Sequence, residues 1–301
     1  MNITVIGEAN IDISVKPCQD TSHVSTKQAC TPSHISFHYG GVARNIAHNL
    51  CLLGHNVRLM TVFGDDDFAS RLIDDCKSIG IDLSLSSQFE DAKSPIFLSF
   101  NDEIGRIQSA HSDIELNSCL DLDWMLERID AVNRADLVIA DTLLSAEALT
   151  FLIDHCFVPL YIDTVSPNRA LLLSEAMRQS WKKSFHALKC NHAEAQAMTG
   201  ITESDEAAKY LNAKGIENVY LTLGEDGVIF CSKKEIQHFP AVEVEAVNVT
   251  GSGDAFLAGV VHGNVMGKNY VDAVSCGLKM AKLACEVETP VNSRVEFEDF
   301  S

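Results

Sequence analysis

The residues whose types and spacing best suit chemistry lie near the C-terminus, in the run Asn248-Val249-Thr250-Gly251-Ser252-Gly253-Asp254-Ala255-Phe256. Apolar residues dominate from Asp254 to Met266, which predicts a buried helix whose first turn leaves backbone N–H groups free. A helix end of this kind attracts anions. Gly251 and Gly253 would let a ligand approach the backbone, and Asp254 adds a carboxylate at the same point. An anion site beside a base is what phosphoryl transfer to an alcohol requires.

The same run also has a simpler interpretation, in which Asp254 only caps the helix and the glycines only form a tight turn. Neither familiar nucleotide fingerprint is present: no Lys follows the second glycine as in a P-loop, and no third glycine completes G-x-G-x-x-G. The other motifs of the chain distinguish between the two interpretations.

Composition excludes several classes of partner. The chain has 301 residues, 46% of them hydrophobic, which is enough to bury the core of one large α/β domain. A net charge of −19 argues against a nucleic-acid polymer or an anionic membrane surface as partner. The ten cysteines form no C-x-x-C pair, and the N-terminus lacks the pattern of a secretion signal. We therefore expect a cytoplasmic protein with reduced thiols.

Short apolar runs alternate with longer segments of helical period. We expect strands at Ile3 to Ile6, Val57 to Val62, Leu137 to Ala140, Leu160 to Ile162, Ala187 to Cys190, Val219 to Leu223 and Val228 to Cys231. We expect helices at Val42 to Leu53, Asp66 to Ile79, Leu122 to Asn133, Ala146 to Cys156 and Ala193 to Thr199. This alternation predicts a mainly parallel sheet covered by helices on both faces, with ligands at the carboxyl ends of the strands.

Two segments interrupt this rhythm, Ile13 to Tyr39 and Asp91 to Asp113. Both are rich in polar residues and contain alternating patches, and Asn101 to Gly105 has the composition of a hairpin loop. We expect residues 13–39 and 91–113 to form a small inserted β-sheet that serves as a lid within a single domain spanning 1–301. Closure of a lid would exclude water from a transferring phosphoryl group.

Polar residues that suit a sugar follow the first strand and the first inserted segment. Asn10 and Asp12 lie on one side of an extended chain and offer a donor and acceptors to vicinal hydroxyls. The paired glycines Gly40 and Gly41 would let a sugar lie against the backbone, and Asn45 follows one helical turn later. Taken singly, these residues also fit turn chemistry and a flexible hinge.

Two further motifs suit phosphates or a nucleotide. Asn191 and Glu194 follow a predicted strand, and they fit either a capping box or contacts to phosphates and hydrated Mg²⁺. The run Leu221-Thr222-Leu223-Gly224-Glu225-Asp226-Gly227 ends another strand and fits either a hairpin or the wall of a nucleotide site. His34 and His38 share a strand face but lack a third ligand at a useful spacing, so a metal centre there is disfavoured.

Taken in order, four motifs resemble those of the ribokinase-like (PfkB) sugar and nucleoside kinases: Gly40-Gly41 with Asn45, Asn191-x-x-Glu194, Leu223-Gly224-x-x-Gly227 and Thr250-Gly251-Ser252-Gly253-Asp254. The resemblance covers essentially the whole chain. It implies a three-layer α/β/α fold with a β-sheet lid, ATP as phosphoryl donor, Mg²⁺, and phosphorylation of a primary sugar hydroxyl. It also implies a small-molecule acceptor, and a homodimer formed through the lid.

The resemblance implies a role for each matching residue. Asp254 would be the catalytic base, and the amides of Gly251, Ser252 and Gly253 would form the anion hole. The residues that hold the sugar would be Asn10, Asp12, Gly40, Gly41 and Asn45. Those on the nucleotide side would be Asn191, Thr222, Gly224 and Gly227, with Glu194 binding Mg²⁺ through water. The resemblance also implies a monovalent cation, K⁺, that would contact Asn248 and Thr250, with further ligands from Glu288 to Ser293.

Within the family, the run from Gly40 to Gly54, Ala140-Asp141 with Ser145 to Leu149, and Asp163 to Ser166 look most similar to pseudouridine kinases. Thr164 and Arg169 stand where those kinases usually have Pro and Lys. The resemblance thus implies transfer to the 5′-hydroxyl of pseudouridine. The alternatives are a related kinase for ribose, adenosine, another nucleoside or a ketose, and a non-catalytic sugar-binding protein of the same fold. An oxidoreductase is disfavoured because the first strand lacks the glycine fingerprint.

Overall fold

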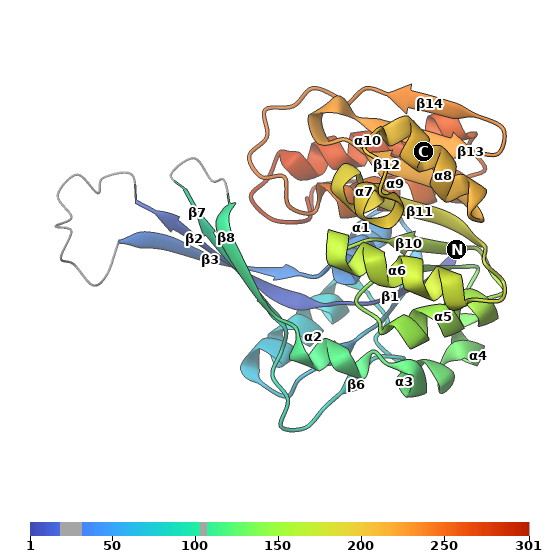
Figure 1. Cartoon of the computed structure of the whole chain (residues 1–301). Coiled ribbons are helices and arrows are strands. Elements are labelled where there is room, and N and C mark those ends of the chain that lie inside the picture. The colour runs from blue at the N-terminus through green and yellow to red at the C-terminus, as the bar shows by residue number, and fades with distance from the viewer. Residues whose placement is uncertain (19–31, 103–106, 301) are drawn as a thin grey trace.

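The computed structural model describes residues 1–18, 32–102 and 107–300, and its centre is an eight-stranded sheet with the order β14-β13-β12-β11-β10-β9-β1-β4 (Figure 1). The neighbouring strands β12, β11, β10, β9, β1 and β4 pair in parallel. At one edge of the sheet, β13 pairs antiparallel with both β12 and β14. Their bounds are β1 Asn2–Ile6, β4 Asn56–Met60, β9 Leu137–Asp141, β10 Leu160–Asp163, β11 Phe185–Asn191, β12 Ile216–Thr222, β13 Val228–Ser232 and β14 Ile236–Phe239.

Helices cover both faces of this sheet, because successive side chains of each buried strand point to opposite sides. Val5 belongs to one hydrophobic cluster and Ile6 to the other. One layer contains α3 Leu122–Leu126, α4 Ile129–Val132, α5 Ala146–His155, α6 Pro167–Gln179, α7 His192–Thr199 and α8 Ser204–Ala213. The other contains α1 Val42–Leu52, α2 Asp67–Ile79, α9 Ser252–Val265 and α10 Tyr270–Cys285. The predicted three-layer α/β/α arrangement is confirmed.

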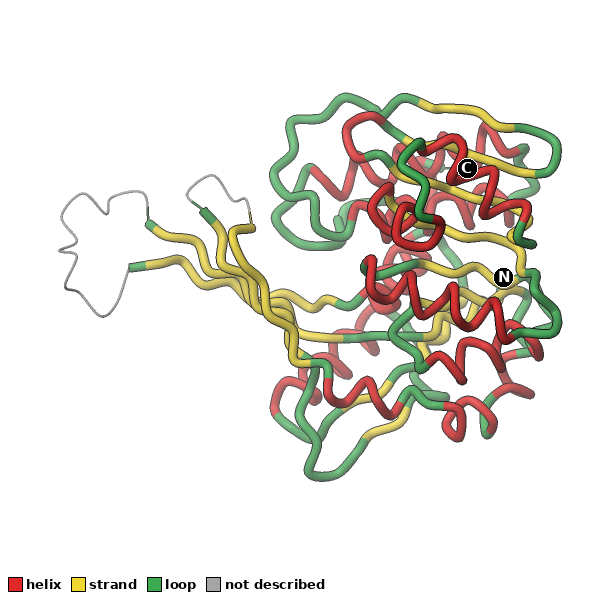
Figure 2. Tube along the Cα trace, in the orientation of Figure 1, coloured by secondary structure: helices red, strands yellow, loops and turns green. Residues whose placement is uncertain are grey.

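A second sheet of four strands projects from this body (Figure 2). Its order is β3-β2-β7-β8, with bounds β2 Asn10–Pro17, β3 Ser33–Gly40, β7 Ile96–Asn101 and β8 Ile107–Asp113. Both segments predicted to form accessory strands therefore do so, and β7 and β8 form the predicted antiparallel pair. The predicted loop residues 103–105 and the lid residues 19–31 lie outside the described residues.

The strand registers give the second sheet one apolar and one more polar face. Ile13 lies opposite Phe37 on β3 and Leu98 on β7, whereas the adjacent Asp12 lies opposite His38 and Phe97. Since β2 begins at Asn10, shortly after β1 ends at Ile6, the second sheet starts at the carboxyl end of a main strand.

Two sequence predictions are wrong in detail. The helix expected over 122–133 is broken into α3 and α4 at Arg128, whose guanidinium instead binds the carbonyl oxygens of Leu85 and Trp124. The strand expected over 57–62 breaks after Met60, and the short strand β5 Val62–Phe63 pairs with β6 Ser87–Gln88 outside the main sheet. Strand β14, which the sequence analysis missed, has exposed side chains at three of its four residues.

No helix in residues 1–18, 32–102 and 107–300 is both long and apolar enough to cross a lipid bilayer. Every cysteine within those ranges is a free thiol.

Candidate active site

The glycine-rich turn forms the amino end of α9, as the sequence predicts. Gly251 has the left-handed φ of +80° at the N-cap position, and no side chain caps this end. A Cβ on Gly251 would lie 2.1 Å from the carbonyl oxygen of Pro290, so both the space and the backbone angle require glycine. The sequence resemblance assigns the anion hole to the amides of Gly251, Ser252 and Gly253, but the Ser252 amide donates to the carbonyl oxygen of Val249 at 3.3 Å. Among the described residues, no partner accepts the amide hydrogens of Gly253 and Asp254. These two N–H groups can therefore bind an anion at the positive end of the helix.

Asp254 lies in the first turn of α9, and its side chain is buried. Its Oδ2 atom accepts a 2.9 Å hydrogen bond from Nδ2 of Asn45, which lies in the first turn of α1. Burial raises the pKa of the Asp254 carboxyl to about 6, while the Lys189 ammonium and the Asn45 hydrogen bond oppose this shift. Asp254 is therefore a carboxylate at neutral pH with the affinity for a proton that a general base needs.

The predicted sugar-binding residues come together on the other side of Asp254. Asn10 pairs with Gly40 in the register of β2 and β3. A Cβ on Gly40 would lie 2.3 Å from Oδ2 of Asp12 and 2.6 Å from Oδ1 of Asn10, so the missing side chain makes room for both polar groups. The Oδ1 atom of Asn10 is buried without a hydrogen-bond partner. That unused acceptor suits a ligand hydroxyl.

Asp12 and Gly41 complete this group. Burial and the nearby Asp254 raise the pKa of the Asp12 carboxyl to about 7. Gly41 is the N-cap of α1 with φ +94°, and a Cβ there would lie 2.4 Å from the carbonyl oxygen of Glu8. All five residues predicted to hold the sugar thus lie around the junction of β2, β3 and α1.

Of the two interpretations that the sequence left open for Asn191 and Glu194, the capping box is present at the amino end of α7. The Asn191 side chain accepts a hydrogen bond from the Glu194 amide, and Oε2 of Glu194 accepts one from the Asn191 amide at 2.8 Å. The same Oε2 atom accepts a 2.5 Å hydrogen bond from Oγ1 of Thr164, whereas Oε1 has no hydrogen-bond partner among residues 1–18, 32–102 and 107–300. The Glu194 side chain therefore has one oxygen fixed and one able to accept from a metal-bound water.

The turn after β12 contains the remaining nucleotide-side residues. Oγ1 of Thr222 donates to the carbonyl oxygen of Cys190 at 3.4 Å. Gly224 has φ +64°, and a Cβ there would meet nothing within 4 Å. Gly227 has φ +97°, and a Cβ would lie 2.0 Å from the carbonyl oxygen of Phe239. Gly227 thus closes the turn toward β14, while Gly224 lies at an open surface.

The segment predicted to bind a monovalent cation forms a compact turn. The side chain of Asn248 donates to the carbonyl oxygen of Glu288 at 2.8 Å and accepts from the Thr250 amide at 2.9 Å. These bonds bring residues 248–250 against residues 288–290, the two segments that the sequence resemblance pairs.

Sequence reasoning gave no role to two buried acids beside this site, Glu8 and Asp141. Asp141 Oδ2 accepts from the Glu8 amide at 2.8 Å, and Glu8 Oε1 accepts from Nδ2 of Asn117 at 2.8 Å. Burial, followed by the charge of Asp141, raises the pKa of Glu8 to about 8. Burial likewise raises the pKa of Asp141 to about 6. Asp141 ends β9, and Glu8 lies two residues after the end of β1. An acid at the carboxyl end of an apolar strand is the sequence signal that could have identified them.

A buried ion pair was also missed. Nζ of Lys189 on β11 lies 2.9 Å from Oδ1 of Asp163 on β10, and both side chains are at least 90% buried. Burial alone would lower the pKa of the Lys189 ammonium, but the carboxylates of Asp163, Asp254 and Glu194 together raise it. Burial raises the pKa of Asp163. A lysine within the otherwise apolar strand was the available signal.

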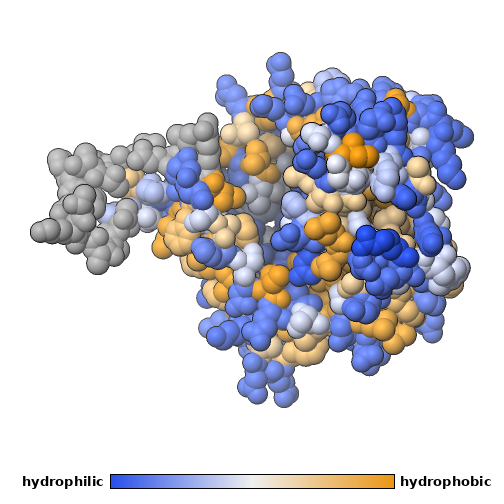
Figure 3. Space-filling view, viewed as in Figure 1, coloured by the Kyte–Doolittle hydropathy of each residue, from blue (hydrophilic) through white to orange (hydrophobic). Residues whose placement is uncertain are grey.

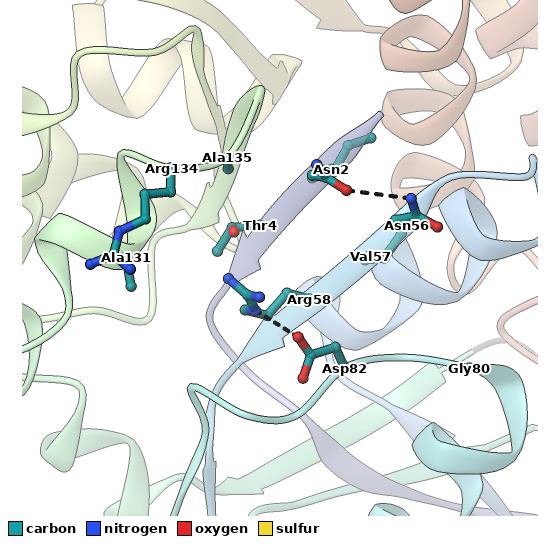
Figure 4. Close-up of a pocket in the computed structure, with 11 residues that line it drawn as sticks. Asn2, Thr4, Asn56, Val57, Arg58, Gly80, Asp82, Ala131, Arg134 and Ala135 are labelled. Carbon is teal, nitrogen blue, oxygen red and sulfur yellow. Dashed lines mark hydrogen bonds and ion pairs between the residues drawn. The ribbon is translucent and has the colours of Figure 1, made fainter.

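A hollow lies at the end of the main sheet opposite to the amino end of α9 (Figure 4). It has a volume of about 490 Å³ and is lined by residues at the amino ends of β1 and β4, among them Asn2 and Asn56. The ion pair between Arg58 and Asp82, 2.7 Å long, lies at its wall. None of the residues named above for the α9 site lines it, so we assign the chemistry to the carboxyl ends of the strands.

The site combines an anion-binding helix end, a buried carboxylate and unused polar atoms for hydroxyl groups. Within the described residues, no cluster of three or more His, Cys, Asp or Glu side chains could hold a metal ion by itself. The arrangement suits transfer of a negatively charged group to a hydroxyl that Asp254 deprotonates.

Comparison with known proteins agrees with this geometry. A model of the pfkB family of carbohydrate kinases matches residues 1–296. The chain is 29% identical over 294 residues to a pseudouridine kinase of Escherichia coli K12, covering 94% of this chain and 91% of that protein. It is 24% identical to a ribokinase of Staphylococcus aureus, covering 94% and 93%. A ribokinase structure from Thermotoga maritima superposes with a TM-score of 0.84 at 23% identity, covering 99% and 98%.

Proposed function

Because this chain belongs to the pfkB family of carbohydrate kinases, we propose that it transfers the γ-phosphoryl group of ATP to the 5′-hydroxyl of pseudouridine. The observation that carries the proposal is the Asp254 carboxylate at the amino end of α9, bonded to Asn45. The pseudouridine kinase of E. coli and this chain match over nearly their whole lengths, which favours this acceptor.

In the proposed reaction, Asp254 accepts the proton of the acceptor hydroxyl as the new P–O bond forms. The amides of Gly253 and Asp254, together with the α9 helix end, stabilise charge on the transferring phosphoryl group. Asn10 and Asp12 hold the acceptor's ring hydroxyls, so that the 5′-hydroxyl lies at Asp254. The polar face of the second sheet closes over the acceptor and excludes water.

Mg²⁺ fits this site through the phosphates of ATP rather than through a cage of protein ligands. The Oε1 atom of Glu194 has no hydrogen-bond partner in the part of the chain that the structure describes, and it suits a metal-bound water. When bound, Mg²⁺ neutralises phosphate charge. On the nucleotide side, Asn191, Thr222 and Gly224 would line the site, and Gly227 would shape it. We also propose a monovalent cation, K⁺, beside Asn248 and Thr250, because the hydrogen bond from Asn248 to the Glu288 carbonyl oxygen brings the 288–290 segment to this turn.

A panel of acceptors tests the proposal. Purified protein is incubated with ATP, Mg²⁺ and K⁺ and with pseudouridine, uridine, adenosine, inosine, ribose or fructose, and ADP release is measured. We expect the highest kcat/KM with pseudouridine. A preference for ribose or another nucleoside would assign a sibling activity, whereas no ADP release with any acceptor would favour a sugar-binding protein. Replacing KCl with choline chloride tests the cation.

The second sheet also supports a proposed homodimer. Its apolar face carries Ile35, Phe37 and Phe100, which are 58%, 59% and 40% exposed, and apolar residues gather there in Figure 3. Pairing with a second copy would bury this face. Light scattering should give twice the mass of the chain for the wild type, and the mass of a single chain for Phe37→Lys. A wild-type monomer at micromolar concentration would contradict the dimer.

A further inference from the structure

The Lys189–Asp163 ion pair has no role in the reaction as described so far, yet it lies directly against the anion site. A Cβ on Gly253 would lie 2.7 Å from Nζ of Lys189 and 3.2 Å from its Cε. The end of the lysine side chain therefore packs against the turn that carries the free amides. Only glycine at position 253 leaves room for the ammonium group in this place.

The hydrogen-bonding capacity of the pair is only partly used. An ammonium group has three donors, and within the described residues Nζ of Lys189 makes a single hydrogen bond, to Oδ1 of Asp163. Oδ2 of Asp163 is buried and has no partner. A buried charge is costly unless it is compensated, so an isolated structural pair would be expected to satisfy these atoms. The remaining donors suit an anionic group placed at the amides of α9.

The charges around the pair favour the same interpretation. Lys189 is the cation whose charge acts on Asp254, whereas Arg44 acts on Asp12 and Arg169 acts on Asp141. The acids facing this region come from five different elements: Asp12 on β2, Asp141 on β9, Asp163 on β10, Glu194 on α7 and Asp254 on α9. A phosphoryl group entering here would add further negative charge. Without the ammonium, both ionisation of Asp254 and binding of the anion would be disfavoured.

We infer that Lys189, held in place by Asp163, is a positioning residue that keeps Asp254 ionised and offsets the charge of the phosphoryl group at the α9 anion site. This inference rests on the proposed kinase function and deepens it. Asp163 fixes the direction of the lysine side chain, and Gly253 provides the space for it.

The test compares Lys189→Met, Lys189→Arg and Asp163→Asn with the wild type. Arg58→Met serves as the control, because it removes a 2.7 Å ion pair at the other end of the same sheet. For Lys189→Met we expect kcat to fall about a hundredfold, and the acid limb of the kcat/KM pH profile to move to higher pH. Lys189→Arg should restore the position of that limb in part. Asp163→Asn should lower kcat without moving the limb to higher pH, because it removes no positive charge.

A second readout does not depend on activity. In protein labelled with ¹³C at the aspartate carboxyl carbons, the Asp254 signal is assigned with Asp254→Asn and titrated by NMR. The Asp254 signal should titrate at higher pH in Lys189→Met than in the wild type or Arg58→Met. If the wild type phosphorylates no acceptor, the kinase proposal fails, but this titration still tests the pair. An unchanged titration in Lys189→Met overturns the inference. If Lys189→Met does not fold, the titration of the Asp254 signal is compared between Lys189→Arg and Asp163→Asn. Equal shifts of that titration in the two variants overturn the inference.

Discussion

Asn45 donates a 2.9 Å hydrogen bond to Asp254 across 209 positions of the chain. The bond joins the first turn of α1, which follows the second sheet, to the first turn of α9, which carries the anion site. It therefore links the part of the protein that binds the acceptor to the carboxylate that would activate it. The buried bond also favours the ionised form of Asp254.

Replacing the base tests its assignment most directly. Asp254→Asn should bind ATP and acceptor with near-normal Kd, because the size of the side chain is kept, but kcat should fall by about 10² to 10⁴. Isothermal titration and steady-state kinetics measure the two quantities. Asp272→Asn, in the first turn of the neighbouring α10, is the matched control. Turnover close to that of the wild type would remove Asp254 from the proposed role.

Loss of the Asn45 hydrogen bond should change the pH dependence of the reaction. The Asp254 pKa is about 6 in the wild type, so activity should rise with pH through this region as the base ionises. Because Asn45 lowers that pKa, Asn45→Ala should move the acid limb of kcat/KM to higher pH and cost more activity at pH 6 than at pH 8. Asn56→Ala, at the opposite end of the sheet, should leave the limb in place. A uniform loss at all pH values would point to a steric role instead.

Adding a methyl group at Gly253 should displace the end of the Lys189 side chain, which packs against this glycine. The Cβ of Gly253→Ala would lie 2.7 Å from Nζ of Lys189, and we expect kcat to fall between about ten- and a hundredfold. In a Lys189→Ala background the collision is absent, so the same substitution should cost much less. This double-mutant cycle isolates the contact. Equal losses in both backgrounds would show that the glycine acts independently of the lysine.

The buried Glu8 carboxyl should make stability depend on pH. Its pKa is raised to about 8 in the folded protein, whereas the unfolded chain should have the usual value near 4.5. The folded state therefore holds an extra proton between these values, and the free energy of unfolding falls as pH rises from about 4.5 to about 8. Glu8→Gln should be more stable than the wild type at pH 8 by at least about 1 kcal/mol, and similar at pH 5.

Urea unfolding at the two pH values measures this difference. Glu243→Gln, which changes an exposed side chain, is the control and should show no such pH-dependent gain. A Glu8→Gln variant that is equally destabilised at both pH values would show that the Asn117 hydrogen bond, rather than the proton, dominates at this position.

Local patterns in the sequence were sufficient to predict the three-layer fold and most of its elements. Periodicity identified the buried strands, and the capping box at Asn191 and Glu194 follows from a spacing of three residues. The apolar run after Gly251 also predicted a helix whose first turn leaves amides free, whereas the left-handed backbone angle of Gly251 came only from the structure. These features depend on neighbours in the chain, which is why the sequence alone reveals them.

Only the tertiary structure decided which of these motifs meet. The order of the strands places β10 beside β11, and hence Asp163 beside Lys189. The packing of α1 against α9 brings Asn45 to Asp254. The break at Arg128 likewise depends on carbonyl oxygens that folding delivers to its guanidinium. Periodicity does not encode sheet order or helix packing, because both are set by contacts between segments far apart in the chain. The sequence by itself thus determined which residues make up the site. Folding determined the distances between them and, through burial, the ionisation of their side chains.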